Sequence, residues 1–135
     1  MNESSEVRNV MVVVRKAPHG TIYVQEALEV MLIVAAYSMN ISVVFLDDGV
    51  YALKKGQDTS ELGSKPFMSA FRALVDWEIE HVYVDRDALK NRGINENELT
   101  EIGEDENTGE PVHPQVLSHK EIYKLMQEQH TILSF

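Results

Sequence analysis

Two short apolar runs without polar alternation constrain the fold of this chain most. They cover Asn9–Val14 and Ile41–Leu46, and a third strand-like segment follows at His81–Val84. A strand that helices cover on both faces has this composition, because neither face meets water. Helical patterns separate these segments, so the sequence predicts an α/β fold in which a parallel sheet lies between helical layers.

Turn and cap signals indicate where the other elements begin and end. Thr21 is expected to cap the first helix, Gly93 to stop a later one, and Ser118 with Glu121 to form a capping box. The predicted helices cover 21–39, 50–55, 66–77 and 85–92, and another begins after 118; short extended pieces are predicted near 99–102 and 116–117, and a last strand at 131–135.

The first predicted helix carries two apolar stripes instead of one. The first stripe has the spacing of a core-facing surface and comprises Val24, Ala27, Leu28, Met31, Leu32 and Ala35. The second stripe comprises Val30, Ile33, Val34 and Tyr37, so little of the helix surface beyond Glu29 suits water. Two interpretations stay open: the helix is buried within its own fold, or the second stripe is a subunit interface.

Composition limits the classes of partner. The chain has 135 residues, 12 basic against 22 acidic side chains, a net charge of −10 and 44% hydrophobic residues. This predicts one globular domain over 1–135, with 1–7 flexible and a solvated acidic loop at 103–113. The acidic balance disfavours direct binding to nucleic acid or to a membrane surface. We expect a cytoplasmic protein, because no apolar run approaches membrane-spanning length and no secretory signal is evident.

The residue types for most covalent and metal chemistry are missing. The chain has no cysteine, which excludes disulfides, thiolate metal sites and a thiol nucleophile. Its five histidines lack the spacing of a metal site, and no G-x-S-x-G elbow exposes a serine. We therefore predict no catalytic residue, no cofactor and no metal ligand.

A candidate pocket lies where the first two strands end, because ligands of such folds gather at the carboxyl ends of strands. It comprises Lys16, His19, Gly20, Asp47, Asp48 and Gly49. The first three residues could hold an anion at a helix start or form a plain turn. The two aspartates could bind a metal or act as an acid and base, or they could end the strand and cap a helical turn.

Four segments together resemble the DsrE/DsrF/DsrH superfamily, and specifically its DsrF/TusC branch. They are Arg15-Lys16-Ala17-Pro18-His19-Gly20-Thr21, Glu26-Ala27-Leu28-Glu29, Phe45-Leu46-Asp47-Asp48-Gly49-Val50-Tyr51 and Ile132-Leu133-Ser134-Phe135. The resemblance implies a three-layer α/β/α sandwich around a five-stranded, mainly parallel sheet. It also implies a heterohexamer with DsrE-like and DsrH-like subunits, two copies of each, that relays sulfur as cysteine persulfide and exchanges it with a DsrC/TusE-like carrier.

The resemblance places the carrier cysteine of the DsrE-type subunit after the third strand, at about Val84 to Arg86, where this chain has none. The leading hypothesis is therefore a non-catalytic subunit of a sulfur-relay complex in intracellular sulfur oxidation. The alternatives are a TusC-like subunit of the relay for 2-thiouridine in tRNA, a flavodoxin-like module that binds a nucleotide or small ligand, and a homo-oligomer without a sulfur role.

Overall fold

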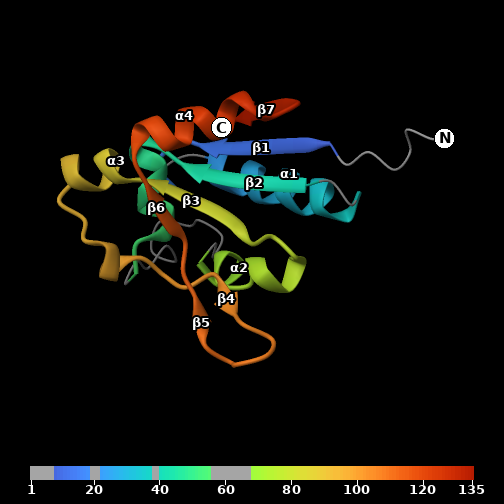
Figure 1. The fold of residues 1–135 in the computed structure, drawn as a ribbon. Coiled ribbons are helices and arrows are strands. Elements are labelled where there is room, and N and C mark those ends of the chain that lie inside the picture. The colour runs from blue at the N-terminus through green and yellow to red at the C-terminus, as the bar shows by residue number, and fades with distance from the viewer. Residues whose placement is uncertain (1–7, 19–21, 38–39, 56–67) are drawn as a thin grey trace.

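A computed structural model describes residues 8–18, 22–37, 40–55 and 68–135. Five strands form one sheet in which every neighbouring pair is parallel. In spatial order they are β6 (Gln115–Leu117), β3 (His81–Asp85), β2 (Asn40–Phe45), β1 (Asn9–Val14) and β7 (Thr131–Ser134). The predicted α/β sandwich around a five-stranded sheet is confirmed, and Figure 1 shows β2 in its middle, between β1 and β3.

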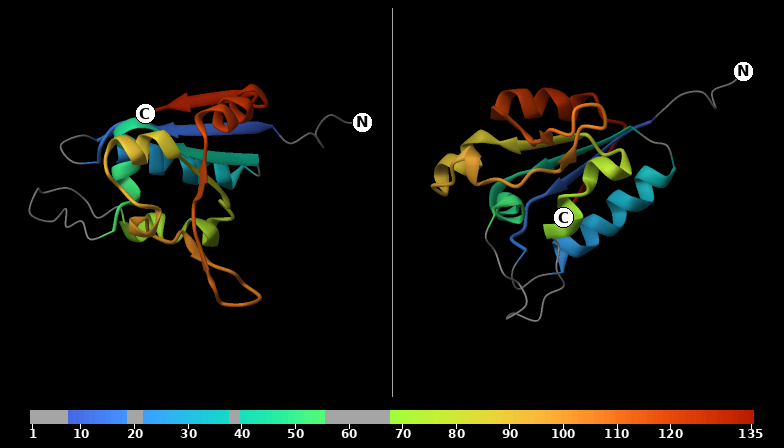
Figure 2. Two further views of the ribbon diagram at one scale, coloured as in Figure 1. Left: turned by 60° about the vertical axis from the view of Figure 1, so that its left-hand side comes forward. Right: turned by 90° about the horizontal axis from the view of Figure 1, so that it is seen from below.

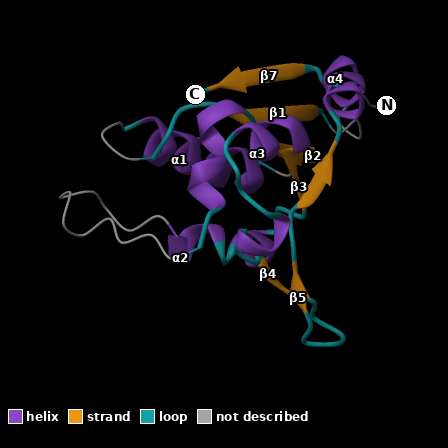
Figure 3. Ribbon diagram, turned by 90° about the vertical axis from the view of Figure 1, so that its left-hand side faces the viewer, coloured by secondary structure: helices purple, strands orange, loops and turns teal. Residues whose placement is uncertain are grey.

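Helices lie on both faces of this sheet (Figure 2). The α-helices are α1 (Tyr23–Ala36), α2 (Met68–Phe71), α3 (Arg86–Asn91) and α4 (His119–Gln127). In the described residues, 3-10 helices cover Asp47–Leu53, Leu74–Trp77 and Glu96–Glu98, and a small hairpin joins β4 (Gly103–Glu104) to β5 (Pro111–Val112). Figure 3 shows the hairpin projecting beyond the main sheet.

Each apolar strand serves two cores, which explains the missing alternation. On β1, Val10, Val12 and Val14 belong to the larger core, which includes the buried face of α1. Met11 and Val13 face the opposite way, into a smaller core with Ile122 of α4. A strand buried on both faces can be apolar at every position, as the sequence predicted.

Tyr83 lies at the border of the smaller core and is partly buried there. Burial raises the pKa of its phenol, and the nearby carboxylate of Glu128 raises that pKa further. The phenol therefore stays neutral through the physiological pH range, which suits a side chain packed beneath a helix.

The first helix begins close to its predicted start. Thr21, its expected cap, lies outside the described residues, and so does the flexible segment expected at 1–7. At the N-cap position, Ile22 provides no side-chain hydrogen bond. The helix ends at Ala36, and its exit is closed by a hydrogen bond from Tyr37 N–H to the carbonyl of Val34.

The single helix predicted from Pro66 to Trp77 is wrong beyond Phe71. Two short helices occupy the described part, Met68–Phe71 and Leu74–Trp77, and Pro66 itself lies outside the described residues. The backbone N–H of Val75 donates to the carbonyl of Ile102 at 3.0 Å, so it does not continue the helical ladder. A long-range hydrogen bond therefore replaces a local one at this break.

The segment 103–113, expected as an acidic loop, contains a hairpin. Gly103 pairs with Val112 in antiparallel register, and the residues between the strands are exposed. The backbone N–H groups of Asn107 and Thr108 donate to the Asp105 carboxylate, which lowers the pKa of Asp105. Gly109 permits the turn between the two strands, because its φ of 72° lies in the region that favours glycine.

The capping box at the start of α4 forms as predicted. Ser118 Oγ accepts from the N–H of Glu121 at 3.2 Å, and the Glu121 carboxylate accepts from the N–H of Ser118 at 3.0 Å. Hydrogen bonding of the Glu121 carboxylate to the backbone N–H of Ser118, and to the Ser118 side chain, lowers the pKa of Glu121. The two bonds of the box have a second effect. They satisfy two backbone donors at the helix start, so the direction in which α4 leaves β6 is fixed locally.

Candidate functional site

The two aspartates of the candidate pocket lie at the carboxyl edge of the sheet but do not face one another. Asp47 Oδ2 accepts from Arg15 Nε at 3.1 Å, and Asp48 Oδ1 accepts from Arg92 Nε at 2.9 Å. Both carboxylate side chains are more than half exposed, at 54% and 58%. The arrangement ties the ends of β1 and α3 to the turn after β2. At the N-cap of the 3-10 helix Asp47–Leu53, Leu46 provides no side-chain hydrogen bond, so the turn is held by these ion pairs and not by a side-chain cap.

Gly49 has a packing role in the same turn. A Cβ atom at this position would overlap the carbonyl oxygen of Val14, so only glycine allows the turn to approach the end of β1. The N–H of Gly49 donates to the carbonyl of Leu46 at 2.8 Å, and the N–H of Leu46 donates to that of Val14 at 3.0 Å. The close approach is therefore held by backbone hydrogen bonds.

The lysine of the candidate pocket is exposed. Lys16 Nζ lies 6.0 Å from the ring centroid of Tyr23, at the outer limit of a cation–π contact. His19 and Gly20 lie outside the described residues. The anion site expected from these three residues stays a prediction.

The end of β3 holds a buried carboxylate where the resemblance places a sulfur carrier in another subunit type. Asp85 is 7% exposed, and its Oδ1 accepts from the N–H of Asp87 at 3.3 Å, which caps α3. Its Oδ2 lies 3.9 Å from Nδ1 of His119, the first residue of α4. The carboxylate thus caps α3 and lies near the first residue of α4, and it offers no sulfur nucleophile.

The candidate interface stripe on α1 is divided between core and surface. Val34 is buried in the larger core, and Val30 packs against it partly buried. Ile33 is 58% exposed and Tyr37 is 72% exposed. Two residues of the stripe therefore stabilise the fold, and the other two present an apolar surface whose role as a subunit interface stays a prediction.

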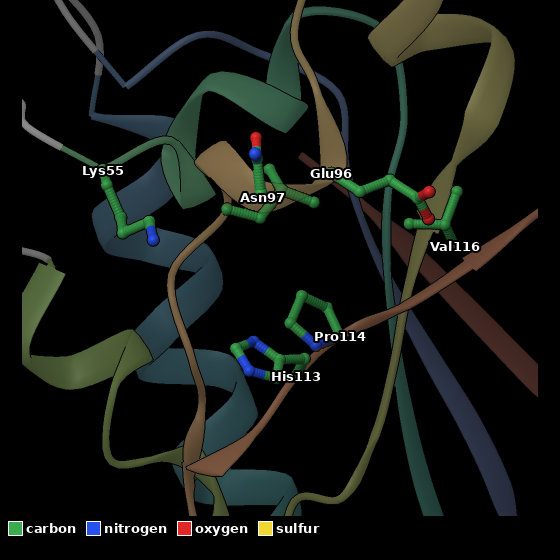
Figure 4. A pocket seen from close by; sticks show the side chains of 7 residues that line it. Lys55, Glu96, Asn97, His113, Pro114 and Val116 are labelled. Carbon is green, nitrogen blue, oxygen red and sulfur yellow. The ribbon is translucent and has the colours of Figure 1, made fainter.

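Sequence reasoning missed an open pocket of about 490 Å³ at the amino end of β6 (Figure 4). It is lined by Lys55, Glu96, Asn97, Leu99, His113, Pro114 and Val116. These residues come from three segments that only the tertiary fold brings together. No motif or spacing within one segment marks the pocket, so the sequence carries no direct signal for it.

The described residues offer neither a metal site nor a membrane-spanning helix. Within those ranges, no group of three or more histidine, aspartate or glutamate side chains could hold a metal ion. No helix in the described part of the chain is long and apolar enough to cross a membrane.

Comparison with known families and sequences gives one consistent group of relatives. The model of the DsrE/DsrF-like family matches residues 8–135. The intracellular sulfur oxidation protein DsrF of Allochromatium vinosum is 45% identical over 135 residues, which cover 98% of this chain and 99% of that protein. A TusC homolog of Vibrio parahaemolyticus is 31% identical over 121 residues, covering 90% of this chain and 93% of the homolog.

A solved structure supports the same fold at lower sequence identity. The crystal structure of the ychN protein from E. coli matches with a TM-score of 0.72 and 17% identity, covering 96% of this chain and 100% of that chain. At this identity the match establishes the fold alone.

Proposed function

Because this chain belongs to the DsrE/DsrF-like family, we propose that it is a non-catalytic, cysteine-free subunit of a heterohexameric sulfur-relay complex in intracellular sulfur oxidation. The observation that carries the proposal is its full-length similarity to a protein named for intracellular sulfur oxidation, combined with a cysteine count of zero. The complex works inside the cell, and this chain's contribution is shape and contact surface.

The chemistry of the relay explains why such a subunit acts only with others. A carrier thiolate attacks the outer sulfur of a donor persulfide, a new S–S bond forms on the carrier, and the donor leaves as a thiolate. Only a thiolate is nucleophilic enough for this step at neutral pH. At the end of β3, this chain has the helix-capping carboxylate of Asp85 in place of a thiol, so its partners must supply the sulfur-carrying residue.

The proposed partners are a DsrE-like and a DsrH-like subunit, two copies of each alongside two copies of this chain. A DsrC/TusE-like carrier exchanges sulfur with the complex, and no direct contact with nucleic acid or membrane is involved. The exposed pair Ile33 and Tyr37 on α1 is the proposed contact with a partner subunit. Their apolar surface gains free energy when another subunit removes it from water.

Coexpression with these two partners tests the proposal. We expect native mass spectrometry to give a hexamer with two copies of each chain, and omission of this chain to abolish it. After incubation with a persulfide donor, the DsrE-like chain should gain the mass of one sulfur atom while this chain stays unchanged. Failure of the three chains to associate, or sulfur loading on this chain when it is purified alone, would contradict the proposal.

A TusC-like role in tRNA thiolation is the second candidate, because the curated relatives include TusC homologs at 31% and 37% identity. The higher identity to DsrF favours sulfur oxidation. Deleting the gene in its native host separates the two roles. Loss of sulfur oxidation with unchanged 2-thiouridine supports the first role, and loss of 2-thiouridine supports the second.

A further inference from the structure

The pocket beside β6 is formed where two backbone segments meet. Lys54 and Leu99 form an isolated antiparallel bridge, and the N–H of Lys55 donates to the carbonyl of Glu98 at 2.8 Å. This pairing holds Lys55 beside the 3-10 helix Glu96–Glu98. The chain returns at His113 and Pro114 before entering β6, the edge strand of the sheet, which completes the wall.

The interior of the pocket is apolar and its rim is polar. Leu99 is 3% exposed, Pro114 is buried and Val116 is partly buried, so these three side chains provide a preformed apolar surface. Lys55, Glu96, Asn97 and His113 are exposed around it. A small number of polar groups around an apolar surface is typical of sites that bind small organic groups, and the volume of about 490 Å³ is in the usual range.

The polar side chains of the rim have no partner among the residues that the structure describes. Neither the ammonium of Lys55, the carboxylate of Glu96, the amide of Asn97 nor the ring of His113 forms a hydrogen bond or ion pair with the residues that the structure describes. Glu98 differs, because its carboxylate accepts from the N–H of Asn95 at 2.9 Å and lies 3.9 Å from Lys54 Nζ. The carboxylate of Glu98 therefore has partners within the protein, whereas the four polar groups of the rim have none among the described residues.

The distribution of charge around the rim favours one kind of ligand. In the view of Figure 4, the side chain of Lys55 and the ring of His113 lie toward one side of the opening, and the Glu96 carboxylate lies toward Val116 on the other. A carboxylate suits the first side, because both groups can donate hydrogen bonds to it. On the other side, the Glu96 carboxylate can accept a hydrogen bond from an N–H group of the ligand. Its negative charge repels ligands that carry several negative charges.

We propose that this pocket binds an N-acylated apolar amino acid through its free carboxylate, its apolar side chain and its amide N–H. The carboxylate contacts Lys55 and His113, the apolar side chain covers Leu99, Pro114 and Val116, and the N–H donates to Glu96. Two sources share this chemistry: a small acylated amino acid, and the carboxyl-terminal residue of a peptide. The inference goes beyond the proposed sulfur-relay role and does not rest on it, although Val116 of the pocket pairs in the sheet with Val84 near the end of β3.

Titration of the isotope-labelled chain with N-acetyl-leucine, followed by amide NMR, tests the proposal. We expect saturable shifts at Leu99 and Val116, with a dissociation constant on the order of millimolar, as is usual for a ligand of this size. N-acetyl-leucinamide, which lacks the carboxylate, should bind about tenfold more weakly, since charge-assisted hydrogen bonds are lost. Equal binding of acid and amide, or no saturable shift, overturns the proposal.

Variants locate the site. Lys55→Met should raise the dissociation constant about tenfold, and Lys120→Met, which removes an exposed lysine of α4 outside the pocket, should leave it unchanged. The same spectra report whether each variant is folded. Equal effects of the two lysine variants would place binding elsewhere and overturn the proposal.

A second pair of probes distinguishes the two sources. Acetyl-Gly-Gly-Leu, a peptide with a free carboxyl end, should bind at least as tightly as N-acetyl-leucine if the pocket accepts a chain end. Weaker binding of the peptide would identify a small acylated amino acid as the ligand. Either result supports the proposed contacts in the pocket and identifies one of the two sources. Failure of both probes to bind overturns the proposal.

Discussion

Single residues at the carboxyl edge of the sheet have structural roles that cannot be assigned from the residue types alone. The sequence Asp47-Asp48-Gly49 is compatible with a metal site, an acid–base pair or a strand end. The structure directs the two carboxylates to two different arginines and places Gly49 against the backbone of β1. These contacts cross between distant segments, so the sequence could identify the candidate residues but not choose among their roles.

Replacing Gly49 with alanine should destabilise the fold strongly. The added Cβ overlaps the Val14 carbonyl oxygen, and backbone atoms cannot move aside as a flexible side chain can. We expect a loss of about 3 kcal/mol in the free energy of unfolding, measured by urea denaturation. Gly109→Ala is the control, because its Cβ meets open space and only the positive φ costs about 1 kcal/mol. Equal losses would refute the close-approach argument.

Removing either surface ion pair of the aspartates should have little effect. Asp47→Asn and Asp48→Asn each break one pair whose carboxylate is more than half exposed. Exposed pairs contribute about 0–1 kcal/mol, so each variant should lose less than that in urea denaturation. A large loss would show that these ion pairs contribute more than exposed pairs do, and a gain in stability would show that the two carboxylates repel each other.

At the scale of elements, the sequence predicted a helix cap formed by nearby residues. It did not predict a helix break caused by a hydrogen bond to a distant segment. The box Ser118–Glu121 formed as predicted because it requires only residues three apart. The helix expected over 66–77 is broken in its described part, because Val75 bonds to Ile102, a partner 27 residues away. Local patterns therefore located α4 but could not locate the break between α2 and the following 3-10 helix.

Loss of the Ser118 hydroxyl should weaken α4 and the smaller core that it covers. Ser118→Ala removes the acceptor for the Glu121 N–H, and such caps contribute about 1 kcal/mol. Urea denaturation should show this loss, whereas Ser134→Ala, at an exposed position on β7, should stay within about 0.5 kcal/mol of the original chain. If the two variants were equally stable, the box would not contribute to folding.

The carboxylate of the same box should make stability depend on pH. Hydrogen bonds from Ser118 lower the folded-state pKa of Glu121 below its ordinary value of 4.5. Its contribution is therefore fully present above that value and is lost as pH falls through the lowered pKa. Glu121→Gln should unfold at lower urea concentration than the original chain at pH 7, and this difference should shrink on acidification. Glu106→Gln, an exposed residue of the hairpin, should show no comparable pH-dependent difference.

At the scale of the whole molecule, the sheet divides its apolar residues between two cores of different size. The larger core takes in most of α1, and α4 covers the smaller one. This division buries Val34 and leaves Ile33 and Tyr37 exposed on the outer side of α1. The second apolar stripe of α1 was evident in the sequence. Which of its residues are buried and which are exposed depends on the angle at which α1 packs on the sheet.

Charging the exposed part of α1 should separate folding from association. Ile33→Asp and Tyr37→Asp change exposed positions, so the isolated chain should lose no more than about 0.5 kcal/mol in stability. A buried interface residue contributes about 2 kcal/mol or more, so association with the DsrE-like and DsrH-like chains should weaken at least about 30-fold. Tyr123→Asp, on α4 in the other helical layer, is the matched control. Equal weakening by all three variants would refute this interface.

The sequence by itself determined the central strands, the helices α1, α3 and α4, the two-sided burial of β1 and β2, the capping box and the absence of a thiol, because each depends on composition or on residues a few positions apart. Only the tertiary structure decided the partners of Asp47 and Asp48, the burial of Val34, the break after α2 and the pocket beside β6. These features depend on contacts between segments far apart in the chain. Their geometry is set by the packing of whole elements, which local patterns do not encode.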